Sequence, residues 1–234
     1  ILNRPKLMTA PLPADFPIRP GFWNVPLWGE IGVYVLGFTA VALLIAGILR
    51  NRRLWLRGAE DPHPVKDGRA RLFSVIADVF TQKKIRETSA GRLHAVLAWG
   101  FFLLFCGTAL ATLDWDVGHY VFDAQFLQGG FYLAYKFVLD CAGIAVLIAL
   151  ALGAARRWSK ESGLPGDARF ICAYLSLAFI VLTGFLVEGI RLAATLPAWS
   201  VYSPIGHLVA KMLLACGLSE AELRLLHTWI WTIH

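Results

Sequence analysis

The residues best suited to chemistry in this chain are three histidines inside long apolar stretches, His94, His227 and His234. Ionisable side chains at membrane depth are costly and are functional candidates by default. His227 and His234 are seven residues apart, so at about 3.6 residues per turn they face nearly the same direction. Imidazole is a common haem ligand, and Trp229 and Trp231 could line a porphyrin. The pattern favours a haem site; a hydrogen bond between helices is the alternative.

Two pairs of charged residues also lie in apolar stretches. Lys136 and Asp140 are four residues apart and Glu188 and Arg191 three, so each pair can meet on one helix face. Two interpretations are open for each pair. The pair is either a neutralising ion pair or a site that binds a quinone head group and handles its protons. For Glu188 and Arg191 the ion pair is preferred.

The composition indicates that a membrane surrounds these side chains. Hydrophobic residues make up 57% of the 234 residues and charged residues 16%, against about 25% charged in soluble domains. Apolar stretches of roughly 20 residues can cross the hydrocarbon. We predict four complete spans and the start of a fifth, at 27–49, 93–113, 131–155, 170–194 and 223–234. The predicted fold is an all-α integral membrane protein, a five-helix transmembrane bundle whose fifth helix is truncated.

Three further elements complete this prediction. Residues 1–26 are Pro-rich and form an outer N-terminal segment, and a short apolar helix is expected near 205–214. Within the polar loop 51–90, apolar residues recur at helical spacing, which is typical of an interfacial amphipathic helix. A contact face for a soluble partner is the alternative. The residues of this helix face are Leu72, Phe73, Ile76, Val79 and Phe80.

The orientation follows from the distribution of Lys and Arg. Residues 50–92 contain eleven of them and 156–169 contain four, whereas 114–130 contain none. Since cytoplasmic loops carry the excess of positive charge, we expect both basic loops inside and the N-terminus outside. The net charge of +6 then belongs to topology and to anionic lipid, and nucleic acid is not expected as a partner.

Depth limits which histidines can share one haem, because both axial ligands must lie at a similar level. The predicted orientation puts His94 near the cytoplasmic surface, His227 in the outer half and His234 near the middle. The partner of His94 is therefore expected beyond residue 234. An outer haem would use His227 or His234, with His207 of the short outer helix as a weaker candidate.

Three stretches of the chain resemble one family of membrane b-type cytochromes. The family includes the gamma subunit of respiratory nitrate reductase, the membrane subunit of heterodisulfide reductase and the membrane domain of electron-transfer-flavoprotein:menaquinone oxidoreductases. The resemblance covers residues 27–234. The residues that carry it are Arg92-Leu93-His94 with Trp99-Gly100-Phe101 and Gly107-Thr108, Thr183-Gly184 with Glu188-Gly189 and Arg191, and Leu226-His227 with Trp231 and His234.

The resemblance implies a bundle that holds haem b. His94 matches the ligand near the cytoplasmic side, and His234 matches the first ligand of the fifth span, whose second ligand lies past the end of this sequence. Trp99 and Trp231 belong to the same cofactor-binding stretches. Lys136 matches a basic residue near the quinone site of the family.

The chain departs from the family at Leu104, where nitrate-reductase-type chains carry a second histidine. Either one haem is present, or an outer second haem uses His227 or His207. Members of the flavoprotein branch continue into a cytoplasmic iron–sulfur domain, and no Cys-rich motif of that kind occurs in these residues.

By this resemblance, residues 27–234 are the membrane part of a quinone-linked oxidoreductase in a prokaryotic inner membrane. It would pass electrons between a cytoplasmic iron–sulfur protein or electron-transfer flavoprotein and menaquinone or ubiquinone. Partner subunits or a C-terminal domain would share the chemistry. The alternative is a haem-free secondary transporter or proton-conducting protein, although the repeats and broken helices typical of transporters are not visible.

Overall fold

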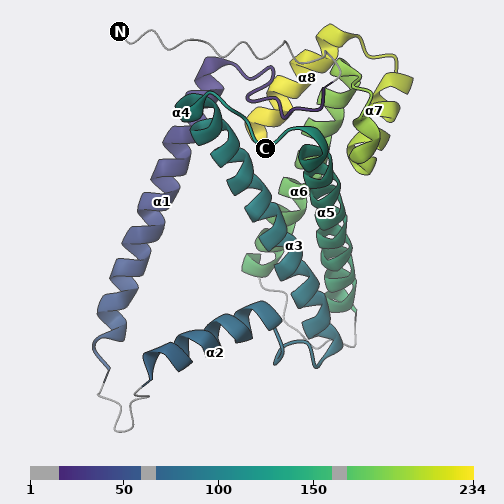
Figure 1. The fold of residues 1–234 in the computed structure, drawn as a ribbon. Helices are drawn as coiled ribbons and strands as arrows, with labels where there is room; N and C mark the ends of the chain where they lie inside the picture. The colour runs from purple at the N-terminus through teal and green to yellow at the C-terminus, as the bar shows by residue number, and fades with distance from the viewer. Residues whose placement is uncertain (1–15, 59–66, 160–167) are drawn as a thin grey trace, which may run out of the picture. The chain divides into compact units, whose positions relative to one another are not determined.

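A computed structural model describes residues 16–58, 67–159 and 168–234 of the chain. Within these residues the regular structure is helical, and a single isolated β-bridge joins Ile18 to Gln128. A π-helix at Leu113–His119 and a 3₁₀ turn at Ser200–Tyr202 accompany the α-helices (Figure 1). The α-helices are α1 Leu27–Trp55, α2 Gly68–Thr81, α3 Ser89–Thr112, α4 Tyr120–Phe122, α5 Gly129–Trp158, α6 Ala168–Thr195, α7 Pro204–Ala215 and α8 Glu220–Ile233.

Four helical segments are long and apolar enough to cross a membrane, which confirms the predicted all-α membrane fold. They are Leu27–Trp55, Ser89–Phe122, Gly129–Trp158 and Phe170–Thr195. The short apolar helix is also confirmed, as α7. The fifth helix of the predicted bundle, α8, begins with a capping box, in which Ser219 and Glu222 satisfy each other's backbone N–H groups.

The chain divides into two compact units. Asn24–Ala95 forms the smaller unit, with α1, α2 and the first turns of α3. Ile1–Trp23 and Val96–His234 form the larger unit.

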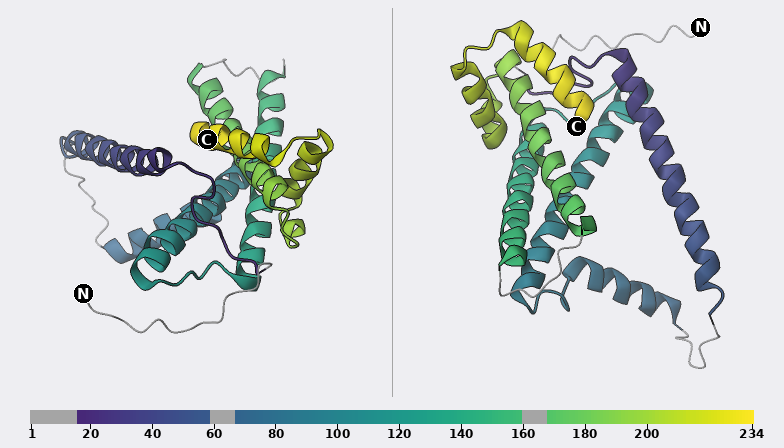
Figure 2. Two further views of the ribbon diagram at one scale, coloured as in Figure 1. Left: turned by 90° about the horizontal axis from the view of Figure 1, so that it is seen from above. Right: turned by 180° about the vertical axis from the view of Figure 1, so that it is seen from behind.

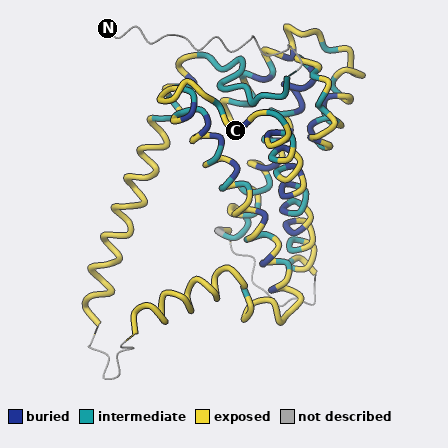
Figure 3. Tube along the Cα trace, viewed as in Figure 1, coloured by how far each residue is buried: buried dark blue, intermediate teal, exposed yellow. Residues whose placement is uncertain are grey.

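In the smaller unit, α2 is the predicted amphipathic helix. The Asp67 carboxylate caps it by accepting from the backbone N–H groups of Arg69 and Ala70, at 3.0 and 3.2 Å. The Asp78 carboxylate accepts a hydrogen bond of 2.7 Å from Lys84, and this contact raises the pKa of Lys84. Both α1 and α2 are exposed almost throughout (Figure 3). Such apolar exposure is what a helix facing lipid requires.

In the larger unit, two glycines bring α3 close to α5. Gly100 and Gly107 are seven residues apart on one face of α3, and small residues let membrane helices approach closely. A Cβ at Gly100 would lie 2.5 Å from Val146, and one at Gly107 would lie 2.5 Å from Leu139. The Tyr135 hydroxyl donates to the Gly107 carbonyl at 3.0 Å.

Helix α6 is the hub of the larger unit, because it contacts α5, α7 and α8 (Figures 1 and 2). Gly143 of α5 accommodates the ring of Phe185, and Gly189 of α6 accommodates Val209 of α7. A buried apolar cluster joins α6, α7 and α8. It contains Ile190, Leu192, Ala193, Ala210 and Leu223.

The acidic loop after α3 is fixed by Asp114, which is fully buried. Its carboxylate accepts from the backbone N–H groups of Phe126 and Leu127, at 2.6 and 2.8 Å. The Arg19 N–H donates to the Leu127 carbonyl at 3.0 Å, so the N-terminal segment joins the same loop.

Candidate functional site

A cluster of three charged side chains bridges α5 and α6 in the larger unit. Lys136, whose side chain is 5% exposed, forms an ion pair with Glu188. Arg191 donates to both carboxylate oxygens of Glu188, at 2.6 and 2.8 Å. The carboxylate therefore lies between two buried cations, which leaves a net charge of +1 on the cluster. Glu188 is its most accessible member, with 25% of its side chain exposed.

Aromatic rings cover the cations of this cluster. The Lys136 ammonium lies 4.7 Å from the ring centre of Trp199 and 5.6 Å from that of Tyr132. Arg191 donates to the Tyr132 hydroxyl at 3.4 Å, and its guanidinium lies 5.9 Å from the Trp199 ring centre. Ring faces attract cations, so Trp199 and Tyr132 compensate part of the buried charge. The same rings offer flat apolar surfaces to a planar ligand.

The Glu188–Arg191 ion pair is confirmed, whereas the ion pair that was one alternative for Lys136 and Asp140 is replaced by other contacts. The Asp140 carboxylate accepts from the Ser203 hydroxyl at 3.0 Å and from the Ile205 N–H at 2.8 Å. It therefore caps the N-terminus of α7, where unsatisfied N–H groups favour a negative charge. Lys136 therefore pairs with Glu188 of α6 and not with Asp140 of its own helix.

Removal of this cap has a predictable cost. We expect Asp140→Ala to lower the thermal unfolding midpoint of the purified full-length protein, because it leaves buried donors unpaired at about 1–3 kcal/mol. Ser219→Ala is the matched control, since it removes a solvent-exposed helix cap at about 1 kcal/mol. A wild-type midpoint in Asp140→Ala would contradict the structural role of Asp140.

His234, the residue directly after α8, contacts α6. Its Nδ1 lies 2.7 Å from the Thr183 hydroxyl oxygen. Gly184, the residue after Thr183, faces the Cε1–Nε2 side of the ring, where a Cβ would lie 3.4 Å from Cε1 and 3.9 Å from Nε2. No side chain of α6 therefore projects from position 184 over the Nε2 edge of this imidazole.

His227 lies about two helical turns before His234. It is only 2% exposed. Its Nδ1 is buried and has no hydrogen-bond partner among the described residues. The ring of Trp23 packs edge-to-face against it, with ring centres 4.7 Å apart. Phe22 packs in the same manner against Trp231, at 6.0 Å. The N-terminal segment thus covers the histidine face of α8.

The remaining candidate residues are His207, His94 and Trp99, and each has its own surroundings. The Nδ1 of His207 lies 3.1 Å from the Ser200 hydroxyl, so this imidazole is bonded within its own loop and helix. His94 is exposed and belongs to the smaller unit. Trp99 packs edge-to-face with Phe102, with ring centres 5.7 Å apart. Within the described ranges no three His, Cys, Asp or Glu side chains gather as a metal site.

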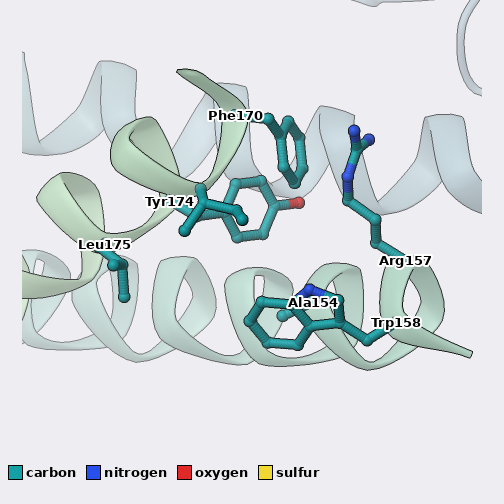
Figure 4. A pocket seen from close by; sticks show the side chains of 7 residues that line it. Ala154, Arg157, Trp158, Phe170, Tyr174 and Leu175 are labelled. Atoms are coloured by element: carbon teal, nitrogen blue, oxygen red, sulfur yellow. The ribbon is translucent and has the colours of Figure 1, made fainter. Parts of the chain in front are cut away.

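A small pocket lies where α5 ends and α6 begins (Figure 4). The guanidinium of Arg157 lies 3.7 Å from the ring centre of Phe170. The lining also includes Trp158, Tyr174 and Leu175, and no histidine or carboxylate. The pocket therefore offers no ligand for haem iron.

Sequence reasoning missed several residues at these sites, Tyr132 among them. Trp199 lies in the loop after α6, and nothing in its local sequence marks it as a partner of Lys136. Trp23 was assigned to an irregular segment, although the adjacent aromatic pair Phe22–Trp23 was a visible signal. Thr183 was noted only as part of a resemblance, and its contact with His234 depends on how α8 packs.

With this geometry in view, one comparison bears on function. The chain is similar to an EtfAB:quinone oxidoreductase. That protein is from Syntrophomonas wolfei subsp. wolfei (strain DSM 2245B / Goettingen), and the two are 28% identical over 233 residues. The alignment covers 94% of this chain and 31% of the relative, so the chain spans about a third of that protein's length. No family model matches the chain, and no solved structure matches it significantly.

This similarity agrees with the electron-transfer-flavoprotein branch of the resemblance drawn from the sequence. It does not test membership of the b-type cytochromes, which stays a prediction.

Proposed function

We propose that residues 27–234 form the membrane domain of a quinone-linked oxidoreductase, passing electrons between a cytoplasmic redox partner and membrane quinone. One observation carries the proposal: the buried Lys136–Glu188–Arg191 cluster under Trp199. The similarity to a quinone oxidoreductase along nearly the whole chain supports it.

The cluster has the properties that a quinone head group requires. A quinone that takes up two electrons and two protons becomes a quinol, and negative charge develops on its oxygens before the protons arrive. Lys136 and Arg191 stabilise such charge through charge-assisted hydrogen bonds. Glu188, which remains partly accessible, would exchange protons with Lys136. Asp140, the third residue predicted for this site, would act indirectly by holding α7 and the loop that carries Trp199.

The histidines fit the haem b that the resemblance implies. His227 is a buried imidazole with an unpartnered nitrogen, and His234 has one nitrogen bonded and its other edge beside a glycine. Both are donors of the kind that haem iron takes. With His94 as a further ligand, these residues would hold one or two haems, and Trp99 and Trp231 would lie in the same cofactor-binding stretches. The bound group supplies one-electron transfer.

We also propose an orientation in the membrane and the partners that the protein binds. The basic loop 51–90 would face the cytoplasm of a prokaryote and dock an iron–sulfur protein or an electron-transfer flavoprotein. Helix α2 would lie at the interface with lipid, since its apolar face is exposed. The N-terminus would then be outside, and the quinone, which we expect to be menaquinone, would bind near the outer surface.

The test uses the purified full-length protein. We expect a b-type difference spectrum between dithionite-reduced and oxidised forms, and we expect a reduced quinone analogue to reduce that haem. Lys136→Met should slow this reduction about 10- to 100-fold, because one charge-assisted hydrogen bond of about 1.5–3 kcal/mol is lost.

Lys211→Met is the matched control, because Lys211 is an exposed lysine on α7. It should react at the wild-type rate. An unchanged rate in Lys136→Met would remove Lys136 from the quinone site. A folded wild-type protein without haem would instead favour the transporter or proton-conducting alternative.

A further inference from the structure

Thr183 of α6 has more hydrogen-bond partners than its single hydroxyl hydrogen can serve. The residue is 5% exposed. Its Oγ1 lies 2.7 Å from the Phe179 carbonyl oxygen, 3.1 Å from the Ile180 carbonyl oxygen and 2.7 Å from His234 Nδ1.

The chemistry of these partners decides the direction of each bond. Carbonyl oxygens only accept, so the hydroxyl hydrogen is directed at the backbone of its own helix, the usual bond of a mid-helix threonine. The oxygen then has lone pairs left for His234 and no hydrogen to give. The close contact with Nδ1 therefore requires Nδ1 to carry the hydrogen, since a neutral imidazole has one N–H and one lone pair.

It follows that the lone pair of His234 is on Nε2. The Nε2 edge lies beside Gly184, where a Cβ would come within 3.9 Å of Nε2 and a longer side chain would extend over it. The two adjacent residues Thr183 and Gly184 thus contact one ring, Thr183 at Nδ1 and Gly184 on the Cε1–Nε2 side. The threonine fixes the tautomer, and the glycine leaves the coordinating edge uncovered by α6.

We propose that Thr183 is a positioning residue that presents the Nε2 lone pair of His234 to haem iron. The inference rests on the proposed haem function and names the group that supports its ligand. Metal-bound histidines usually donate their second N–H to an acceptor, which fixes the ring and raises the basicity of the ligand. Here the acceptor is a side-chain hydroxyl on the neighbouring helix.

The alternative is a hydrogen bond that only joins α6 to α8. Both roles would stabilise the protein, so stability does not separate them. The redox potential of the haem does, because loss of the acceptor makes the imidazole a weaker donor and stabilises ferric iron less. The midpoint potential should therefore rise when the hydroxyl is removed, and haem affinity should fall.

The experiment compares Thr183→Val, Thr183→Ser and Thr195→Val in the full-length holoprotein. Thr195→Val is the control, since the Thr195 hydroxyl donates at 2.8 Å to the Arg191 carbonyl on the same helix but has no histidine partner. We expect Thr183→Val to raise the midpoint potential and to weaken haem binding about 10- to 100-fold. Thr183→Ser and Thr195→Val should behave as wild type.

Wild-type potential and haem content in Thr183→Val would overturn the inference. So would a serine variant that fails like the valine variant. A second measurement, nitrogen NMR of ¹⁵N-histidine-labelled haem-free protein, reads the tautomer directly. His234 should carry its hydrogen on Nδ1 in wild type and lose that preference in Thr183→Val. If wild type binds no haem, the proposed function fails together with the inference built on it, and this measurement then shows only whether Thr183 fixes the tautomer of His234.

Discussion

Replacing His234 with alanine is expected to abolish haem binding at its site and to lower the haem-to-protein ratio by one whole haem. An axial imidazole has no substitute nearby on α6, because Thr183 is bonded to its own backbone and Gly184 has no side chain. The measurement is the difference spectrum of the full-length protein, with haem quantified as its pyridine complex.

The matched comparisons use other histidines of the chain. His119→Ala should keep the full spectrum, because the His119 ring is stacked on Trp115, with ring centres 4.5 Å apart, in the loop after α3. His227→Ala decides between one and two haems: it lowers the ratio only if this buried imidazole is also a ligand. A His234→Ala protein with wild-type haem content would contradict the assignment of His234.

Replacing Glu188 with glutamine is expected to destabilise the protein strongly. The change removes the one negative charge between Lys136 and Arg191 and raises the net charge of the cluster from +1 to +2. Breaking a buried ion pair by removing one partner costs about 3–5 kcal/mol, because the remaining charge is left uncompensated. The measurement is the thermal unfolding midpoint in detergent, together with the yield of monodisperse protein.

A double variant separates stability from chemistry. Glu188→Gln combined with Lys136→Met returns the cluster to +1 and should recover most of the lost midpoint. It should not recover haem reduction by a reduced quinone, because both groups proposed to handle the proton are gone. If the double variant were as unstable as Glu188→Gln alone, charge imbalance would not be the cause of the instability.

The helices could be predicted from the sequence because their signals are local. Hydropathy located the four helices that are long enough to cross a membrane, and the Ser219–Glu222 capping box is a local signal for the start of α8. The ends of the helices were predicted less accurately. Helix α1 continues past its arginines to Trp55. The helical segment that begins at Ser89 continues to Phe122 and does not stop at Leu113. Arginine at a helix C-terminus is compatible with the helix dipole, so charge alone did not mark the boundary.

The candidate site was predictable only where its contacts are within one helix. Glu188 and Arg191 are one turn apart, so their ion pair follows from spacing. The pairing of Lys136 with Glu188 depends on the register of α5 against α6, and the contact of Asp140 with α7 depends on how the loop 196–203 returns. No single-helix pattern contains that information.

The separation of Lys136 from Glu188 by 52 residues has a consequence for biogenesis. Synthesis proceeds from the N-terminus at about 5–20 residues per second, so α5 is made roughly 3–10 s before Glu188 exists. During that interval Lys136 has one carboxylate within reach on its own helix, Asp140, at the i,i+4 spacing that lets such residues pair. Asp140 can therefore pair with Lys136 while α5 enters the lipid. Once α6 has been synthesised, Glu188 pairs with Lys136 and Asp140 can cap α7.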